Sequence, residues 1–155
     1  MLFRQILVPV DYSEPSLAAL QLARGFAEHF GAMLDIVHVW DRPTYISDSV
    51  LVGHGQSQRP LGELIKENAE RDMREFLAKA ALPAGISRRE RLIHGDPASA
   101  LLKEIEQGSS ELVVVGTHGR TGLSHFLLGS VAEKLVRHSP VPVLTVPLDR
   151  KSRSA

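Results

Sequence analysis

Residues 111–119 read Glu-Leu-Val-Val-Val-Gly-Thr-His-Gly, and a further nine residues lead to Gly129 and Ser130. The apolar run before Gly116 is typical of a buried parallel strand, and residues 131–138 are typical of a helix. Glycines let the main chain approach an anion closely, and a helix start adds N–H donors and a positive dipole end. The spacing therefore predicts a main-chain cradle for a phosphate chain, where the Ser130 hydroxyl adds a donor.

The same alternation of strand and helix recurs along the whole chain. The predicted strands cover residues 6–10, 33–40, 87–93, 112–115 and 141–146, and the predicted helices cover 13–30, 61–81, 97–107 and 131–138. This order favours one α/β domain, residues 1–148, built as a doubly wound five-stranded parallel sheet with helices on both faces. Ligands bind such sheets at the carboxyl ends of the strands, where Asp11, Val39, His94 and Gly116 fall.

Two segments show no periodic pattern. Residues 41–60 are rich in Gly, Ser and Pro, and a connection of that length in a compact domain is usually a lid or a binding loop, so we predict a mobile loop. Residues 149–155 are predicted to be a flexible tail. The charged run Arg88-Arg-Glu-Arg91 suits an edge strand, because charge discourages unwanted strand pairing.

Composition excludes several classes of protein. The 155 residues carry no net charge, which argues against a nucleic-acid binder driven by electrostatics. The absence of cysteine excludes disulfides and a thiolate nucleophile. No apolar run reaches the length of a membrane span, and the first residues lack the layout of a signal peptide. We therefore expect a cytoplasmic protein without membrane insertion.

Four positions carry a specific pattern, in which Gly116 and Gly119 are followed after nine residues by Gly129 and Ser130. This spacing is similar to the motif of the ATP-binding branch of the universal stress protein family. The resemblance extends to residues 6–11, 38–39, 94–97 and 139–146, and so covers nearly the whole chain. It implies the Rossmann-like fold of the adenine nucleotide alpha hydrolase-like group. It also implies binding of ATP, ADP or AMP, with Mg²⁺ arriving together with the nucleotide.

The resemblance also implies which residues hold the nucleotide. The loop main chain and the start of the last helix would hold the phosphates, and Asp11 would bind the ribose or lie near a metal. Asp11 is also the residue type expected just before a helix. Pro9, Val10 and Val39, which would frame the adenine, are also typical of an ordinary hydrophobic core. The candidate nucleotide-binding residues are Pro9, Val10, Asp11, Val39, Gly116, His118, Gly119, Arg120, Gly129, Ser130 and Val131. We predict no catalytic residues and no protein metal site.

The last predicted strand is apolar at Val141, Val143, Leu144 and Val146. An edge of this kind needs cover, and pairing with a second copy across a two-fold axis supplies it, as in family members. Together with this edge, the resemblance implies an ATP-binding, dimeric regulator in the stress response, whose nucleotide tunes a surface for an unidentified protein partner. Two alternatives stay open: a slow ATPase or phosphoryl-transferring enzyme, and a dimeric interaction module that binds no nucleotide.

Overall fold

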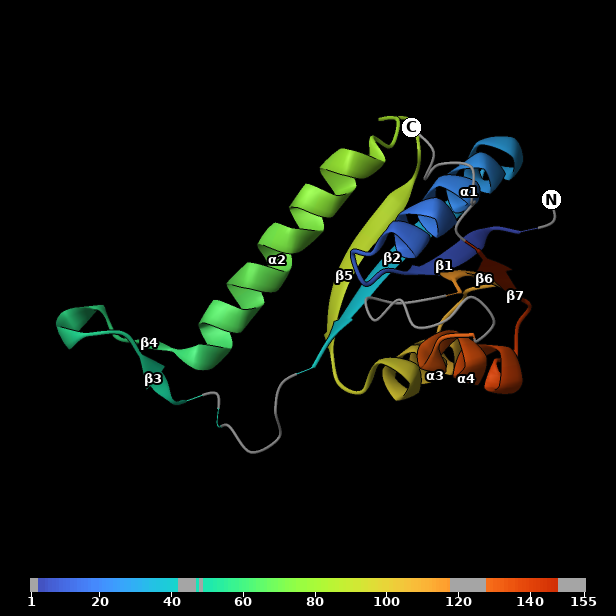
Figure 1. Cartoon of the computed structure of the whole chain (residues 1–155). Coiled ribbons are helices and arrows are strands. Elements are labelled where there is room, and N and C mark those ends of the chain that lie inside the picture. Colours follow the sequence, from blue (N-terminus) through green and yellow to red (C-terminus); the bar gives the residue numbers. More distant parts are fainter. Residues whose placement is uncertain (1–2, 42–46, 48, 118–127, 148–155) are drawn as a thin grey trace, which may run out of the picture.

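The computed structural model describes residues 3–41, 47, 49–117 and 128–147. Helices and strands alternate along it (Figure 1). In chain order they are β1 (Gln5–Pro9), α1 (Glu14–Phe30), β2 (Met33–Trp40), β3 (Leu51–Val52), the short 3-10 helix η1 (Gly55–Ser57), β4 (Arg59–Pro60), α2 (Leu61–Ala80), β5 (Arg88–His94), α3 (Pro97–Gln107), β6 (Leu112–Gly116), α4 (Ser130–His138) and β7 (Val143–Val146). Among the described residues, no helix is long and apolar enough to cross a bilayer.

Five strands form one parallel sheet in the order β5-β2-β1-β6-β7. The chain starts at the centre with β1, builds outward through β2 to β5, and then crosses to β6 and β7 on the other side. The predicted doubly wound α/β sheet is confirmed, and β5 lies at an edge as its charged residues indicated. The order reverses between β1 and β6, so their carboxyl ends form the switch point of the sheet.

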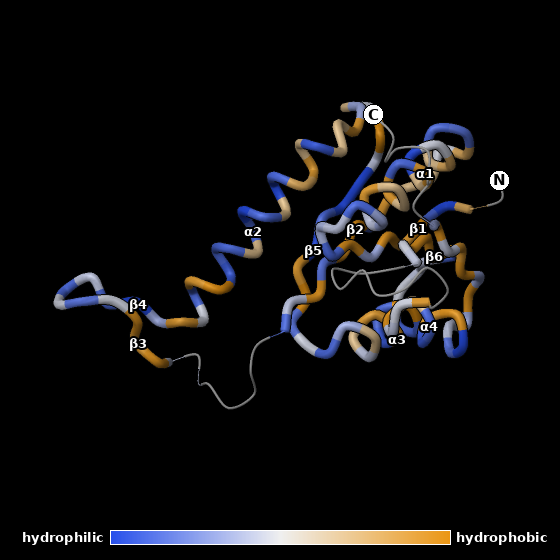
Figure 2. Tube along the Cα trace, in the orientation of Figure 1, coloured by the Kyte–Doolittle hydropathy of each residue, from blue (hydrophilic) through white to orange (hydrophobic). Residues whose placement is uncertain are grey.

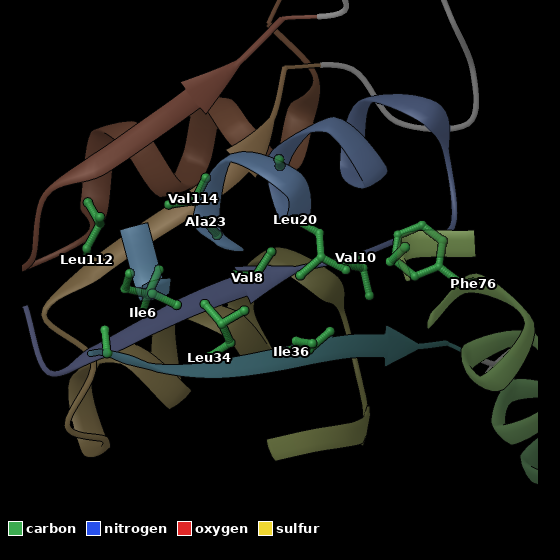
Figure 3. Packing of buried hydrophobic residues seen from close by; sticks show 14 of the residues in the cluster. Ile6, Val8, Val10, Leu20, Ala23, Leu34, Ile36, Phe76, Leu112 and Val114 are labelled. Carbon is green, nitrogen blue, oxygen red and sulfur yellow. The ribbon is translucent and has the colours of Figure 1, made fainter. Parts of the chain in front are cut away.

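Helices cover both faces of the sheet because alternate strand residues point to opposite sides. On one face, Ile6 and Val8 of β1 pack with α1 and α2, as Figure 3 shows. On the other face, Leu7 packs with Leu101 of α3 and Leu135 of α4. The central strands are the most continuous apolar segments of the chain (Figure 2). Full burial of each such aliphatic side chain contributes roughly 1.5–3 kcal/mol to folding.

Local capping signals set the ends of the helices. Ser13 is the N-cap of α1, where its hydroxyl accepts the Ser16 N–H, and Asp96 caps α3 by accepting the Ser99 N–H at 3.0 Å. Gly31 ends α1 in the left-handed conformation, with φ of 66°, and donates its N–H to Ala27 O at 2.9 Å. The helix limits therefore agree with the predicted ones to within one residue.

The structure differs from the prediction at two places. β7 begins at Val143 rather than at Val141, because Pro142 has no N–H and the Val141 N–H instead bonds to the Ser139 hydroxyl at 3.2 Å. The described part of residues 41–60 contains the antiparallel pair β3–β4 and the 3-10 helix between them, which the sequence pattern did not indicate; the mobility of this segment stays a prediction. The predicted tail at residues 149–155 lies outside the described residues.

Candidate functional site

A pocket of about 270 Å³ lies at the carboxyl ends of β1 and β6, which is the switch point of the sheet. This volume is close to the lower end of small-molecule sites, about 300 Å³. Strands β1, β2 and β6 and the first turns of α1, α3 and α4 all contribute side chains to it. The lining residues are Pro9, Val10, Asp11, Ser16, Val37, Val39, Pro97, Leu101, Val115, Gly116, Thr117, Gly129, Ser130, Val131 and Ala132.

Eight of the eleven candidate residues from the sequence line this pocket. They are Pro9, Val10, Asp11, Val39, Gly116, Gly129, Ser130 and Val131. The other three, His118, Gly119 and Arg120, lie outside the described residues. The fold therefore brings segments that are more than a hundred residues apart in the chain to one pocket, because the strands that precede them are neighbours in the sheet.

Val39 lines the pocket and lies beyond the end of the β1–β2 ladder. The β1–β2 ladder ends at the pair of Pro9 and Val37, followed by a bond from the Val10 N–H to Val37 O at 2.8 Å. Main-chain groups alternate in direction along a strand, so Val39 points its N–H and C=O toward the β1 side, as Val37 does. Beyond this ladder those groups offer one donor and one acceptor to a planar ligand edge.

Helix α4 starts at the pocket, and no side chain of the described part of the chain caps it. Its N-cap is Gly129, which has no side chain to accept the first N–H groups, whereas Ser13 and Asp96 cap α1 and α3. The start of α3 shows what such a cap does: the Ser99 main-chain N–H and hydroxyl bond to the Asp96 carboxylate and lower its pKa. No side chain in the described ranges accepts the N–H groups of the first α4 turn, around Ser130 and Val131, and a helix start of this kind favours an anion.

Main-chain contacts hold the end of β6 and the start of α4 in place. The Gly129 N–H donates to Thr117 O at 2.6 Å, so these two residues lie side by side at the pocket. Gly116 packs directly on the start of α1, where a Cβ would come within 2.7 Å of the Pro15 carbonyl carbon. Glycine at this position is therefore required by contact between β6 and α1, a reason that the sequence pattern did not reveal.

Asp11 is held by the turn that leads into α1. Its Oδ1 accepts both the N–H of Ser13, at 3.1 Å, and the Ser13 hydroxyl. Tyr12, between them, has a φ of 67°, which is uncommon for a residue with a side chain. The Tyr12 ring stacks on His38 at 4.2 Å, and its hydroxyl donates to Ala69 O of α2 at 3.2 Å. Contacts with β2 and α2 thus hold the turn that carries Asp11.

Sequence reasoning missed the wall of the pocket that α3 contributes. Pro97 and Leu101 lie one turn apart on α3 and line the pocket opposite Val39 and Val115. The apolar spacing of α3 predicted that Leu101 is buried, but it carried no signal that part of the side chain faces a ligand pocket. Ser16, Val37, Val115 and Ala132 were also missed, because apolar or helical spacing predicts burial and does not mark a ligand pocket.

Comparison with known proteins now decides the family. The model of the universal stress protein family matches residues 2–147. The chain belongs to the universal stress protein family. A universal stress protein of Methanocaldococcus jannaschii is 32% identical over 150 residues, which cover 97% of this chain and 85% of that protein. One of Bacillus subtilis is 30% identical over 148 residues, covering 94% and 99% of the two chains.

Solved structures of universal stress proteins share the architecture. UspA from Lactobacillus plantarum superposes with a TM-score of 0.73 at 26% identity, covering 94% of this chain and 99% of that one. A universal stress protein in complex with cAMP superposes with a TM-score of 0.66 at 25% identity, covering 94% and 98%. Within the described residues of the present universal stress protein, no group of three or more His, Asp or Glu gathers to hold a metal ion.

Proposed function

We propose that this universal stress protein binds an adenine nucleotide, with ATP as the principal ligand, in the pocket between β1 and β6. The observation that carries the proposal is that the pocket joins apolar walls to a helix start whose N-cap is a glycine, with no capping side chain among the residues described. A nucleotide has the matching chemistry, a flat apolar base joined to an anionic phosphate chain. The relative that was solved with cAMP supports the assignment to adenine nucleotides.

Each part of the pocket suits one part of the ligand. The slot between Val39 and Leu101 would receive the adenine, whose edge would meet the main-chain groups of Val39. Gly129, Ser130 and the first turn of α4 would hold the phosphates. Asp11, held by Ser13, would hydrogen-bond the ribose. A Mg²⁺ ion would arrive on the phosphates and keep several of its waters.

A thermal unfolding series with ATP, ADP, AMP, adenosine and GTP tests this proposal. A ligand at 100 times its Kd stabilises a fold by about 2.7 kcal/mol. For a domain of this size, that corresponds to a rise in Tm of roughly 5–10 °C. We expect the largest rise with ATP and a smaller one with adenosine, because adenosine lacks the phosphates. The absence of any rise at millimolar ATP would contradict nucleotide binding.

A matched pair of variants locates the phosphate site. Ser130→Glu places a carboxylate at the start of α4, so we expect it to abolish the response to ATP. Arg137→Gln makes the same change in net charge at the other end of this helix, where Arg137 pairs with exposed Glu133. We expect that variant to keep the response. Equal responses of the two variants would contradict a phosphate site at the α4 start.

We also propose that the protein is a regulator that acts as a dimer through β7. We place it in the cytoplasm, where proteins generally lack disulfides, because the chain contains no cysteine. β7 is an edge strand, with Val143, Leu144 and Val146 only half-buried. Pro142 O and Val146 O accept bonds from the β6 side, so by alternation the main chain of Thr145 faces outward. Nucleotide occupancy would change the surface that this dimer presents to a protein partner.

Light scattering tests the dimer. Thr145→Pro removes the outward N–H without breaking a bond to β6, and Thr145→Val keeps that N–H as a control. We expect Thr145→Pro to halve the molar mass and Thr145→Val to leave it unchanged. An unchanged molar mass in both variants would contradict a dimer through β7.

A further inference from the structure

A short arm projects from the domain between β2 and α2. The arm consists of residues 50–60, in which β3 and β4 pair with Leu51 opposite Pro60 and Val52 opposite Arg59. The Leu61 N–H donates to Val50 O at 2.8 Å and so joins the arm to the start of α2. Figure 1 shows the arm extending beyond the sheet, away from the other helices. No role in nucleotide binding accounts for this feature.

The arm exposes a run of three aliphatic side chains. Val50, Leu51 and Val52 are 46%, 56% and 43% exposed. They are three of the five large hydrophobic side chains that are exposed among the described residues, and β3 is one of the apolar segments in Figure 2. A two-stranded ribbon is marginal in water unless further strands or a packing surface support it. The arm therefore needs a covering surface.

The main chain shows which edge of the arm is open to pairing. Val50 O faces β4, because it accepts the Leu61 N–H, so by alternation the N–H and C=O of Leu51 face the opposite edge. The edge on the β4 side carries Pro60, which has no N–H, and the charged Arg59. Both are devices that prevent strand pairing. The β3 edge carries neither of them.

The charges around the arm favour an identical partner. Residues 49–58 contain no Lys, Arg, Asp or Glu. Arg59 at the base is already engaged, with Nη1 2.9 Å from Glu67 Oε2 and Nη2 3.4 Å from Glu63 Oε2. No like charges would therefore oppose two copies that meet at β3, and a charged partner would find no opposite charge there. The same open, apolar edge is present on every copy of the chain.

We propose that β3 pairs antiparallel with β3 of a second copy, to form a four-stranded β4-β3-β3-β4 sheet centred on Leu51. Across a two-fold axis the same patch meets itself, so the aliphatic side chains of each copy cover those of the other. The outward N–H and C=O of Leu51 bond to the same groups of the second copy. This interface is separate from β7 and from the nucleotide pocket. Together the two interfaces close into a tetramer when their two-fold axes intersect at right angles.

Cysteine cross-linking tests the register directly, because the chain contains no native cysteine. Leu51→Cys places two thiols on the proposed two-fold axis, where facing Cα atoms are about 5.5 Å apart, within the range of a disulfide. Gln56→Cys, at the exposed tip of the same arm, controls for random collisions. We expect disulfide-linked dimers to form at least tenfold faster with Leu51→Cys. Equal rates for the two variants would overturn the proposal.

Light scattering with charged variants gives a second, independent result. Leu51→Lys puts a charge on the edge of β3, and Gln56→Lys puts the same charge on the tip. We expect Leu51→Lys to halve the molar mass, from four chains to two or from two to one, and Gln56→Lys to leave it unchanged. A lower Tm at unchanged mass would mean that the arm packs on its own domain. Unchanged mass without self-cross-linking would mean that the arm meets a different molecule. Either outcome would overturn the proposal.

Discussion

The Asp35→Asn substitution should destabilise the protein more than most single changes, because Asp35 is a buried charge with two cationic partners. Its side chain is 1% exposed on β2. Arg89 binds it with Nε–Oδ1 at 3.1 Å and Nη2–Oδ2 at 2.7 Å, and Arg91 does so at 3.0 and 2.8 Å. Burial alone raises the pKa of Asp35, but the hydrogen bonds and charges of the two arginines outweigh it, so the pKa lies below its usual range.

The expected loss follows from this geometry. Breaking a buried ion pair typically costs about 3–5 kcal/mol. Arg89 and Arg91 are 49% and 26% exposed, so both regain some hydration when the carboxylate is lost. We therefore expect a loss of about 2–4 kcal/mol for Asp35→Asn, somewhat below that range. For a domain of this size the Tm should fall by roughly 5–12 °C.

The pH dependence has a definite sign. Because the folded pKa of Asp35 is below the unfolded one, its contribution is complete above the unfolded pKa of about 3.9 and declines as the pH falls toward the folded value. The stability difference between the wild type and Asp35→Asn should therefore be constant from pH 7 to 5 and shrink below pH 4.

Urea denaturation followed by circular dichroism measures this difference at each pH. Glu133→Gln is the control, because Glu133 and Arg137 form a pair whose side chains are 50% and 68% exposed, and such pairs contribute little. A loss below about 1 kcal/mol for Asp35→Asn at pH 7, the usual level of an exposed pair, would refute the reasoning. A difference that stays constant through pH 3 would refute the assignment of the pH dependence to this carboxylate.

Three further substitutions test the turns around the pocket by urea denaturation. Gly116→Ala should cost about 1–3 kcal/mol through its clash with Pro15. Gly85→Ala, where a Cβ meets nothing within 4 Å, should be close to neutral, and similar losses for the two would contradict the contact argument. Tyr12→Phe should cost about 0.5–1.5 kcal/mol through the lost bond to Ala69 O, and no loss would mean that this bond adds nothing. Ser13→Ala should cost about 0.5–2 kcal/mol and Ser13→Thr much less, because only threonine keeps both the capping oxygen and the hydroxyl that donates to Asp11.

Much of the fold was predictable because its signals are local. Ser13, Gly31 and Asp96 act on main-chain groups within four residues of themselves, so the helix limits can be read from neighbouring positions. The buried strands are short apolar runs between such signals. Where the local signal was weak, the prediction was less complete. Each strand of the β3–β4 arm has only two residues, which is too short to show an alternating hydrophobic pattern. β7 is shorter than predicted because Pro142 has no main-chain N–H.

The candidate site was predictable only in part, for a related reason. The residues that line the pocket from β1, β6 and α4 belong to motifs or to strand ends. Pro97 and Leu101 line it because α3 packs beside α4, a relation between distant segments that has no trace in local spacing. The three candidate residues in the loop, His118, Gly119 and Arg120, lie outside the described residues, so their role stays a prediction.

The sequence by itself determined the order and type of the main elements and the family, because periodicity, capping and glycine spacing are properties of neighbouring residues. The tertiary structure alone decided which strands are neighbours, and therefore where the switch point and the pocket lie. It also paired Asp35 with Arg89 and Arg91 across two strands and left the β3 edge open. These features depend on contacts between residues in different strands, which form only when the chain folds.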